Sequence, residues 1–159
     1  MSKPLVVILM GSKADLDHCN KISDACKQYG LETVLRIASA HKTPEHALTI
    51  LRDYEADDRP KVYITVAGRS NALSGFTDGS VSAPVIACPP ISESFGGADV
   101  FSSLRMPSGI APAVVLEPAN AALLAAKIFG VANVEVREQV KVSQKRAAEK
   151  IVEDDASVR

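Results

Sequence analysis

The chain has 159 residues, which suits one domain with a sizeable core and is short for two, so we expect a single domain over residues 1–159. Its 18 basic and 19 acidic residues give a net charge of −1, which disfavours nucleic acid or a membrane surface as a partner. The three cysteines form no C-x-x-C pair, so neither a disulfide framework nor a zinc knuckle is indicated. Without a signal-peptide pattern or an apolar run of the ~18 residues that span a bilayer, we expect a cytoplasmic protein.

Apolar runs alternate with helical patterns along the whole chain. Strands are predicted at residues 5–10, 32–39, 61–68, 83–90 and 112–118. Helices are predicted at residues 15–29, 44–54, 71–79, 120–130 and 134–153, with Thr43 as the N-cap of the second helix and Pro44 at its first position. This alternation with short links predicts an α/β fold, a three-layer doubly wound parallel sheet. The core would cover about residues 5–130, followed by a C-terminal helix over about 134–153.

The helix at 120–130, N-A-A-L-L-A-A-K-I-F-G, is apolar over most of its circumference. Such a helix must be buried against something. It is either a core helix or a subunit interface, and we favour the interface, so a homo-oligomer is expected.

Four loops should carry the chemistry, because ligands of open parallel sheets bind beyond the carboxyl ends of the strands. In the first loop, M-G-S-K-A-D, Ser12 and Asp15 have the spacing of a capping box. Alternatively, Ser12 and the helix amides bind an anion, and Asp15 accepts hydrogen bonds from ribose hydroxyls. The G-x-G-x-x-G pattern is absent, which disfavours NAD.

The second loop, A-S-A-H-K-T-P, places His41 beside Ser39 and Lys42 at a predicted helix start. The positive end of the helix dipole favours neutral imidazole, which can accept and return a proton. A solvated loop histidine is the alternative. His18 and His46 lie within predicted helices, where we expect exposed surface positions. No histidine pair has metal-ligand spacing, so no metal is expected.

The third loop, A-G-R-S-N-A-L-S-G, offers Ser70 and Asn71 as hydrogen-bond donors or simply as a turn with an N-cap. It lacks the G-x-S-x-G elbow, which disfavours a serine hydrolase. Cys88, after the fourth strand, fits a buried structural thiol better than a nucleophile. The segment 101–109, F-S-S-L-R-M-P-S-G, is a candidate for wrapping over a ligand or for completing a neighbouring subunit's site.

Five motifs occur in a fixed order: G-S-K-A-D, S-A-H-K-T-P, A-G-R-S-N-A-L-S-G, C-P-P and D-V-F-S-S-L-R-M-P-S-G. Together they resemble the phosphoribosylaminoimidazole carboxylase family of purine biosynthesis, over roughly residues 6–129. The resemblance implies a flavodoxin-like fold, a homo-octamer, and neither an organic cofactor nor a metal. It implies a small-molecule substrate, aminoimidazole ribonucleotide, which members carboxylate at C4.

Members of this family carboxylate C4 in one of two ways, which define two classes. Class I moves a carboxylate from the exocyclic nitrogen to C4 and reads S-A-H-R-T-P and A-G-G-A-A-H-L-P-G, whereas class II takes free carbon dioxide. Here Lys42 replaces the class I arginine, Ala72 replaces its second histidine, and Ala14 replaces a usual serine. All three changes resemble class II, which implies reversible addition of CO2 to give 4-carboxy-5-aminoimidazole ribonucleotide without ATP or biotin.

The resemblance also implies roles for the loop residues. The catalytic role falls on His41, which would handle the proton on C4. Substrate binding falls on residues of the first three loops: Ser12, Asp15, Ser39, Lys42, Arg69, Ser70 and Asn71. The first-loop pair would contact the ribose phosphate, the second-loop pair the polar groups of the substrate, and the third-loop residues the base and the transferred carboxylate.

Two other functions remain open from the sequence. One is the class I mutase on the same fold. The other is a non-enzymatic flavodoxin-like module that binds a nucleotide or flavin. The chain has no Trp, four Phe and three Tyr, which is poor material for the aromatic sandwich of a flavin site.

Overall fold

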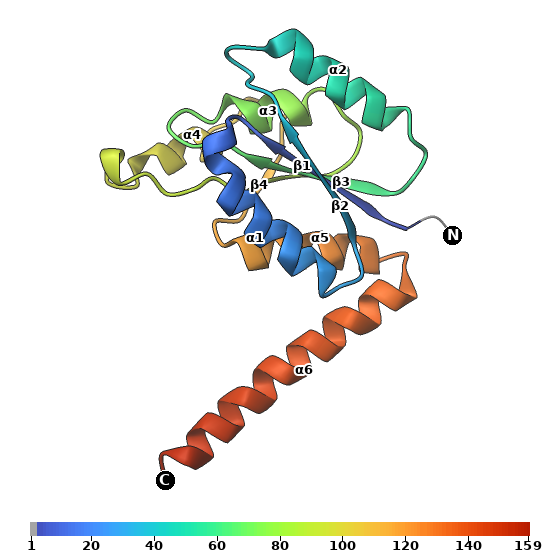
Figure 1. Ribbon diagram of the computed structural model, residues 1–159, viewed down its shortest axis with the longest axis vertical. Helices are drawn as coiled ribbons and strands as arrows, with labels where there is room; N and C mark the ends of the chain where they lie inside the picture. Colours follow the sequence, from blue (N-terminus) through green and yellow to red (C-terminus); the bar gives the residue numbers. More distant parts are fainter. Residues whose placement is uncertain (1–2) are drawn as a thin grey trace.

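The computed structural model describes residues 3–159, and its centre is a five-stranded parallel sheet (Figure 1). The strands are β1 (Leu5–Met10), β2 (Glu32–Ile37), β3 (Lys61–Val66), β4 (Val85–Ala87) and β5 (Ala113–Val114). Their order in the sheet is β2-β1-β3-β4-β5, and every neighbouring pair is parallel. This is the flavodoxin-like order, whose direction of winding reverses between β1 and β3. The predicted doubly wound α/β fold is confirmed.

Helices cover both faces of the sheet (Figure 1). They are α1 (Leu16–Lys27), α2 (Pro44–Glu55), α3 (Ala72–Asp78), α4 (Phe101–Leu104), α5 (Pro118–Gly130) and α6 (Val134–Ser157). Short 3-10 turns lie at η1 (Lys13–Asp15), η2 (Glu93–Phe95) and η3 (Ala98–Val100). Helices α1 and α5 pack on one face, and α2 and α3 on the other.

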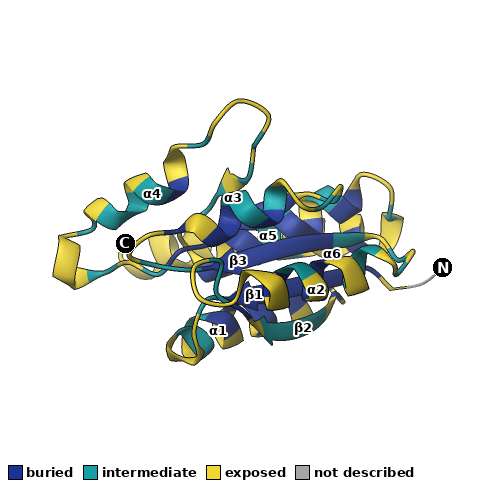
Figure 2. Cartoon of the chain, turned by 90° about the horizontal axis from the view of Figure 1, so that it is seen from above, coloured by how far each residue is buried: buried dark blue, intermediate teal, exposed yellow. Residues whose placement is uncertain are grey.

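The first strand explains why its sequence is apolar at every position. Val6 and Ile8 point into the cluster formed with α1 and α5, whereas Val7 and Leu9 point into the cluster formed with α2 and α3. Alternate side chains of a strand face opposite sides of the sheet, so both sets are buried. Figure 2 shows the resulting band of buried residues through the sheet.

Helix α5 is buried within this chain. Four of its five alanines, Ala121, Ala122, Ala125 and Ala126, are fully buried between the sheet, α1 and the first turns of α6. Val136 and Val140 of α6 belong to the same cluster. The favoured explanation of its apolar circumference as a subunit interface is therefore not needed: it is a core helix, because α6 covers the side that the sheet leaves open.

The last two strands of the sheet, β4 and β5, are shorter than predicted. The prediction gave 83–90 and 112–118, but the ladders cover only three and two residues. Proline lacks an amide hydrogen, so Pro84 and Pro89 cannot donate to a ladder on either side of β4. The first predicted helix, 15–29, likewise divides into η1 and α1.

Two parts of the chain project from this body. Helix α6 runs on to Ser157, beyond the predicted end at 153, and its second half extends away from the sheet (Figure 1). The segment that contains α4 forms a second projection, largely of exposed and half-buried residues (Figure 2). Across residues 3–159, none of the helices combines the length and apolar character that crossing a membrane requires.

Candidate active site

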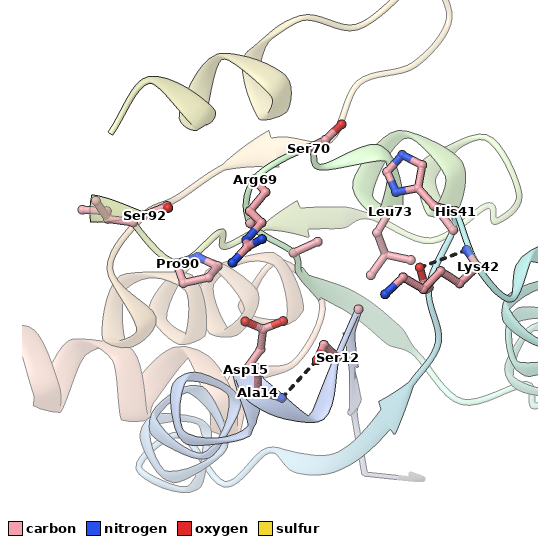
Figure 3. Close-up of a pocket in the computed structure, with 16 residues that line it drawn as sticks. Ser12, Ala14, Asp15, His41, Lys42, Arg69, Ser70, Leu73, Pro90 and Ser92 are labelled. Carbon is pink, nitrogen blue, oxygen red and sulfur yellow. Dashed lines mark hydrogen bonds between the residues drawn. The ribbon is translucent and has the colours of Figure 1, made fainter. Parts of the chain in front are cut away.

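A pocket of about 600 Å³ opens at the carboxyl ends of β1, β2, β3 and β4 (Figure 3). The loop after each of these strands contributes to its wall. Such a crevice forms where the winding reverses, because the helices on the two sides of the switch point lie on opposite faces of the sheet. Of the residues predicted for substrate binding and catalysis, those that line it are Ser12, Asp15, Ser39, His41, Lys42, Arg69 and Ser70.

The loop after β1 presents Ser12 and Asp15 to the pocket. Ser12 is extended, with φ −155° and ψ 151°, and its Oγ accepts a hydrogen bond from the amide of Ala14 at 3.1 Å. Asp15 is the N-cap residue of α1 and makes no side-chain capping bond. Because Ser12 Oγ bonds the amide of Ala14 and not that of Asp15, the expected capping box is not formed. The carboxylate of Asp15 is therefore directed into the cavity (Figure 3). Burial raises the pKa of Asp15, and the nearby His18 opposes that shift.

The loop after β2 is closed by two hydroxyl side chains. Thr43 Oγ1 accepts from the amide of Ser39 at 2.9 Å and donates to its carbonyl at 3.2 Å, and Ser39 Oγ accepts from the amide of Lys42 at 3.1 Å. These bonds satisfy the polar backbone groups of the turn internally. The side chains of His41 and Lys42 are left to project, and Figure 3 shows the ammonium group of Lys42 directed into the cavity.

The loop after β3 contains the one non-glycine residue with positive φ in residues 3–159, Arg69, at φ 61°. Its side chain reaches into the pocket, and its guanidinium points toward the Asp15 carboxylate on the opposite wall (Figure 3). Ser70 lies beside it on the rim. The left-handed backbone at Arg69 thus turns a long cationic side chain back over the carboxyl ends of the strands.

Asn71 lies below the pocket and is 3% exposed, so the structure does not place it where direct substrate binding was expected. Its Oδ1 accepts from the amide of Ser74 and caps α3 at 3.1 Å, and its Nδ2 donates to Ser103 Oγ at 2.9 Å. Both halves of the amide are therefore occupied by protein groups. The N-cap interpretation of Asn71 is confirmed.

The loop after β4 closes the pocket with Pro90, Ile91 and Ser92. Immediately before it, the carbonyl oxygen of Cys88 accepts a hydrogen bond from His18 Nε2 at 3.1 Å. A carbonyl can only accept, so this bond assigns the proton of the imidazole to Nε2. His18 thereby links α1 to the fourth wall of the site.

The prediction that His18 is exposed is wrong. Its side chain is half-buried, and burial lowers the pKa of His18. The available signal was its spacing of four residues from the buried Ile22, which puts both on one face of the helix. His46, by contrast, is exposed on α2 as predicted.

The three thiols are free and buried, as predicted for Cys88. Burial raises the pKa of Cys19, Cys26 and Cys88 to about 12 in each case. A thiolate nucleophile is therefore disfavoured.

The pocket combines separate charges of both signs with one imidazole. Within residues 3–159, neither Lys42 nor Arg69 forms an ion pair, although both side chains line the cavity. No cluster of three or more His, Cys, Asp or Glu side chains with metal-binding geometry occurs in that part of the chain. Two free cations suit an anionic ligand, the carboxylate suits hydroxyl groups, and the exposed imidazole suits proton transfer.

Comparison with known proteins identifies the family to which the chain is similar. The sequence profile of the family described as AIR carboxylase matches residues 5–150. A relative from Treponema denticola named phosphoribosylaminoimidazole carboxylase is 59% identical over 157 residues, which cover 99% of each chain. A relative of the same name from Archaeoglobus fulgidus is 55% identical over 153 residues, 96% of this chain and 84% of the other.

A solved structure of one relative has the same fold as this chain. The crystal structure of Treponema denticola PurE superimposes with a TM-score of 0.97 at 58% identity and covers 99% of both chains. The likeness thus extends over the four loops of the pocket and the projecting α6.

Proposed function

The chain belongs to the AIR carboxylase family, and we propose that it catalyses the class II reaction of that family, with free carbon dioxide as the carboxyl donor. It is an enzyme of purine biosynthesis with the function of a phosphoribosylaminoimidazole carboxylase. One observation carries the assignment of its site: a single pocket gathers His41, Lys42, Arg69 and Asp15 from three separate loops.

The first loop is proposed to hold the sugar end of the ribonucleotide. Helix α1 begins at this edge of the pocket, and amides at a helix start favour a phosphate group. Ser12 Oγ is positioned by its bond from Ala14 and retains a proton to donate. The Asp15 carboxylate, free of a capping bond, accepts from ribose hydroxyls.

The imidazole of His41 is proposed to move the proton. The substrate is an enamine, so its C4 attacks the carbon of CO2, and the electron pair of one C=O bond moves to oxygen to give a carboxylate. His41 then takes the C4 proton, and the electrons of the broken C–H bond restore the aromatic ring. In the reverse direction the imidazolium returns that proton as CO2 leaves.

Lys42 and Arg69 are proposed to stabilise the new carboxylate. Neither cation is paired within the described chain, so both retain hydrogen-bond donors for an anion. The class II assignment is supported by Lys42 itself and by Ala72, which stands in the third loop where class I has a second histidine. Without that histidine, the pocket has fewer groups for transfer from the exocyclic nitrogen.

A direct assay tests the carboxyl donor. Purified protein is incubated with aminoimidazole ribonucleotide and bicarbonate, with carbonic anhydrase added to keep CO2 at equilibrium, and separately with the nitrogen-carboxylated isomer. We expect 4-carboxy-5-aminoimidazole ribonucleotide in the first assay, at a rate that increases with dissolved CO2. Turnover of the isomer alone identifies the mutase instead, and binding without turnover of either compound identifies the non-enzymatic module.

We also propose a cytoplasmic homo-octamer that binds neither nucleic acid nor membranes. Large apolar side chains are exposed on the two projecting parts of the chain, among them Phe101 at 60% and Ile151 at 68%. Apolar groups of this size on projecting elements suit contacts between copies. Light scattering should give a mass eight times 16.8 kDa, and a monomer mass would contradict this.

A further inference from the structure

Arg69 is the feature from which the inference starts. A left-handed backbone brings Cβ close to the following carbonyl and is unfavourable for any residue except glycine. Such a conformation persists only where the surroundings impose it. Contacts outside the third loop must therefore hold Arg69 in place, and they identify residues on which the site depends.

The contact on Arg69 itself comes from Asp99 in η3. Oδ2 of Asp99 accepts a hydrogen bond from the Arg69 backbone amide at 3.0 Å, across 30 positions of sequence. The adjacent Gly68 packs against the same groups, because a Cβ built there would be in ordinary van der Waals contact with Pro90 Cγ at 3.4 Å and with Asp99 Oδ2 at 3.8 Å. The backbone of the third loop is thus held between the Asp99 carboxylate and the fourth wall.

The same turn holds the next residues of the loop. Ser102 Oγ donates to the carbonyl of Asp99 at 2.7 Å and accepts from the Asn71 amide at 2.9 Å. Ser103 Oγ, which is fully buried, accepts from Asn71 Nδ2 at 2.9 Å. Residues 99–103 therefore fix the third loop at both ends of the Arg69–Ser70 pair.

We propose that Asp99 is a positioning residue, which acts through the Arg69 backbone to aim the guanidinium into the pocket. Asp99 is not among the residues that line the pocket, so we assign it no contact with the substrate. Without its acceptor, Arg69 relaxes to negative φ and its side chain turns away from Asp15. The inference rests on the proposed function, since the guanidinium matters only if this pocket binds the ribonucleotide.

The test compares three variants at these positions. Asp99→Ala removes the acceptor, and we expect KM for aminoimidazole ribonucleotide to rise about tenfold, with kcat changed less than about threefold. Asp99→Asn keeps an oxygen that can accept from the amide, so it should restore most of that loss. In an Arg69→Ala background, Asp99→Ala should add less than about a twofold change, because the side chain it positions is already gone.

A matched control is available in α3. Asp78 Oδ2 accepts from the amide of Ala111 at 2.8 Å, a bond of the same kind located away from the pocket. Asp78→Ala should lower thermal stability and leave KM unchanged. An equal rise in KM for Asp78→Ala, or an undiminished effect of Asp99→Ala in the Arg69→Ala background, would overturn the proposal.

A second measurement does not depend on turnover. Hydrogen exchange at the Arg69 amide should be slow in the wild type and in Asp99→Asn, and at least about tenfold faster in Asp99→Ala. If the wild type turns over no ribonucleotide, the proposed function fails while this exchange result still tests the contact. If Asp99→Ala does not fold, Ser102→Ala takes its place, and an unchanged KM together with unchanged exchange refutes the proposal.

Discussion

Two pockets of nearly equal size lie at opposite edges of the sheet, and they differ in what their charged groups do. The one at the carboxyl ends has about 600 Å³, and the one at the amino ends, beside Glu55, Arg59 and Lys61, has about 630 Å³. Size alone would favour the second. The charged side chains Lys42 and Arg69 of the first pocket are left unpaired within the described residues, whereas Arg59 and Glu55 of the second are bound to neighbouring groups.

The amino-end pocket is a network of satisfied groups. Arg59 pairs with Asp57 at 2.8 Å and with Glu32 at 3.1 Å, and Lys61 Nζ donates to the carbonyl of Arg59 at 2.8 Å. At the carboxyl ends, by contrast, the turn bonds use backbone and hydroxyl groups and leave the charged side chains to the cavity. Available hydrogen-bond capacity therefore identifies a site better than volume does.

The greatest loss of activity is expected for a substitution at His41 in the carboxyl-end pocket. Asn has a similar polar size but cannot exchange a proton, so His41→Asn should lower kcat by about 10²- to 10⁴-fold. Equilibrium binding of the ribonucleotide should remain within about threefold of wild type. His46→Asn on α2 is the matched control, because that exposed histidine lies outside the pocket. Near-normal kcat in His41→Asn would remove the imidazole from the mechanism.

A matched pair of lysines compares the two pockets directly. Lys42→Met keeps the length of the side chain but loses the charge that is proposed to stabilise the new carboxylate, so kcat/KM should fall about a hundredfold. Lys61→Met at the other edge should leave kcat/KM unchanged and lower the free energy of unfolding by about 1 kcal/mol. Steady-state kinetics and urea unfolding of both variants measure the contrast. A comparable fall in kcat/KM in Lys61→Met would contradict the assignment of the active site to the carboxyl-end pocket alone.

Glu55 should affect stability only. Its carboxylate accepts from the fully buried Tyr63 hydroxyl at 2.9 Å and from the amide and hydroxyl of Ser82 at 3.0 and 2.9 Å. Glu55→Ala leaves the tyrosine hydroxyl unsatisfied and should lower the free energy of unfolding by about 2 kcal/mol. Adding Tyr63→Phe should recover part of that loss. Urea titration measures both, with kcat/KM remaining at the wild-type value throughout.

The same hydrogen bonds to Glu55 should also give a weak pH dependence of stability. Burial alone would raise the pKa of Glu55, but the hydrogen bonds from Ser82 and Tyr63 outweigh it and hold the pKa below the ordinary 4.5. The unfolded chain therefore takes up this proton first as pH falls. Its contribution to stability is present above pH 4.5 and is lost as pH drops through the lower folded-state pKa. The stability difference between wild type and Glu55→Gln should narrow over that range, and a constant difference would contradict this assignment.

The sequence alone was sufficient for the parts that depend on topology. An aliphatic run such as residues 5–10 that ends at a glycine is typical of a strand buried on both faces, and parallel strands bring their carboxyl-end loops to one edge. That argument predicted that Ser12, His41 and Lys42 lie at one site, and it required no interatomic distances. The environment of helix α5 could not be predicted in the same way. Its apolar composition indicates that it is buried, but does not indicate that α6 is the element that packs against it.

The parts that sequence could not supply are contacts between distant segments. His18 bonds the carbonyl of Cys88, 70 residues away, and Asp99 bonds the amide of Arg69, 30 residues away. No local pattern marks either partner, because neither pair shares a helix or a turn. Asn71 shows the converse: a polar residue in a functional motif was assigned to the substrate, although its local role as a helix cap already used its amide.

The buried thiols have a practical consequence for experiments on this protein. Reagents such as maleimides attack the thiolate, and burial both shields these sulfurs and raises their pKa, so very little of each is ionised at neutral pH. A cysteine introduced on the exposed end of α6, for example by Ser157→Cys, would be the single fast-reacting position. A fluorophore can thus be attached there while every native cysteine stays in place, and its emission can report whether copies of the chain associate through the projecting helices.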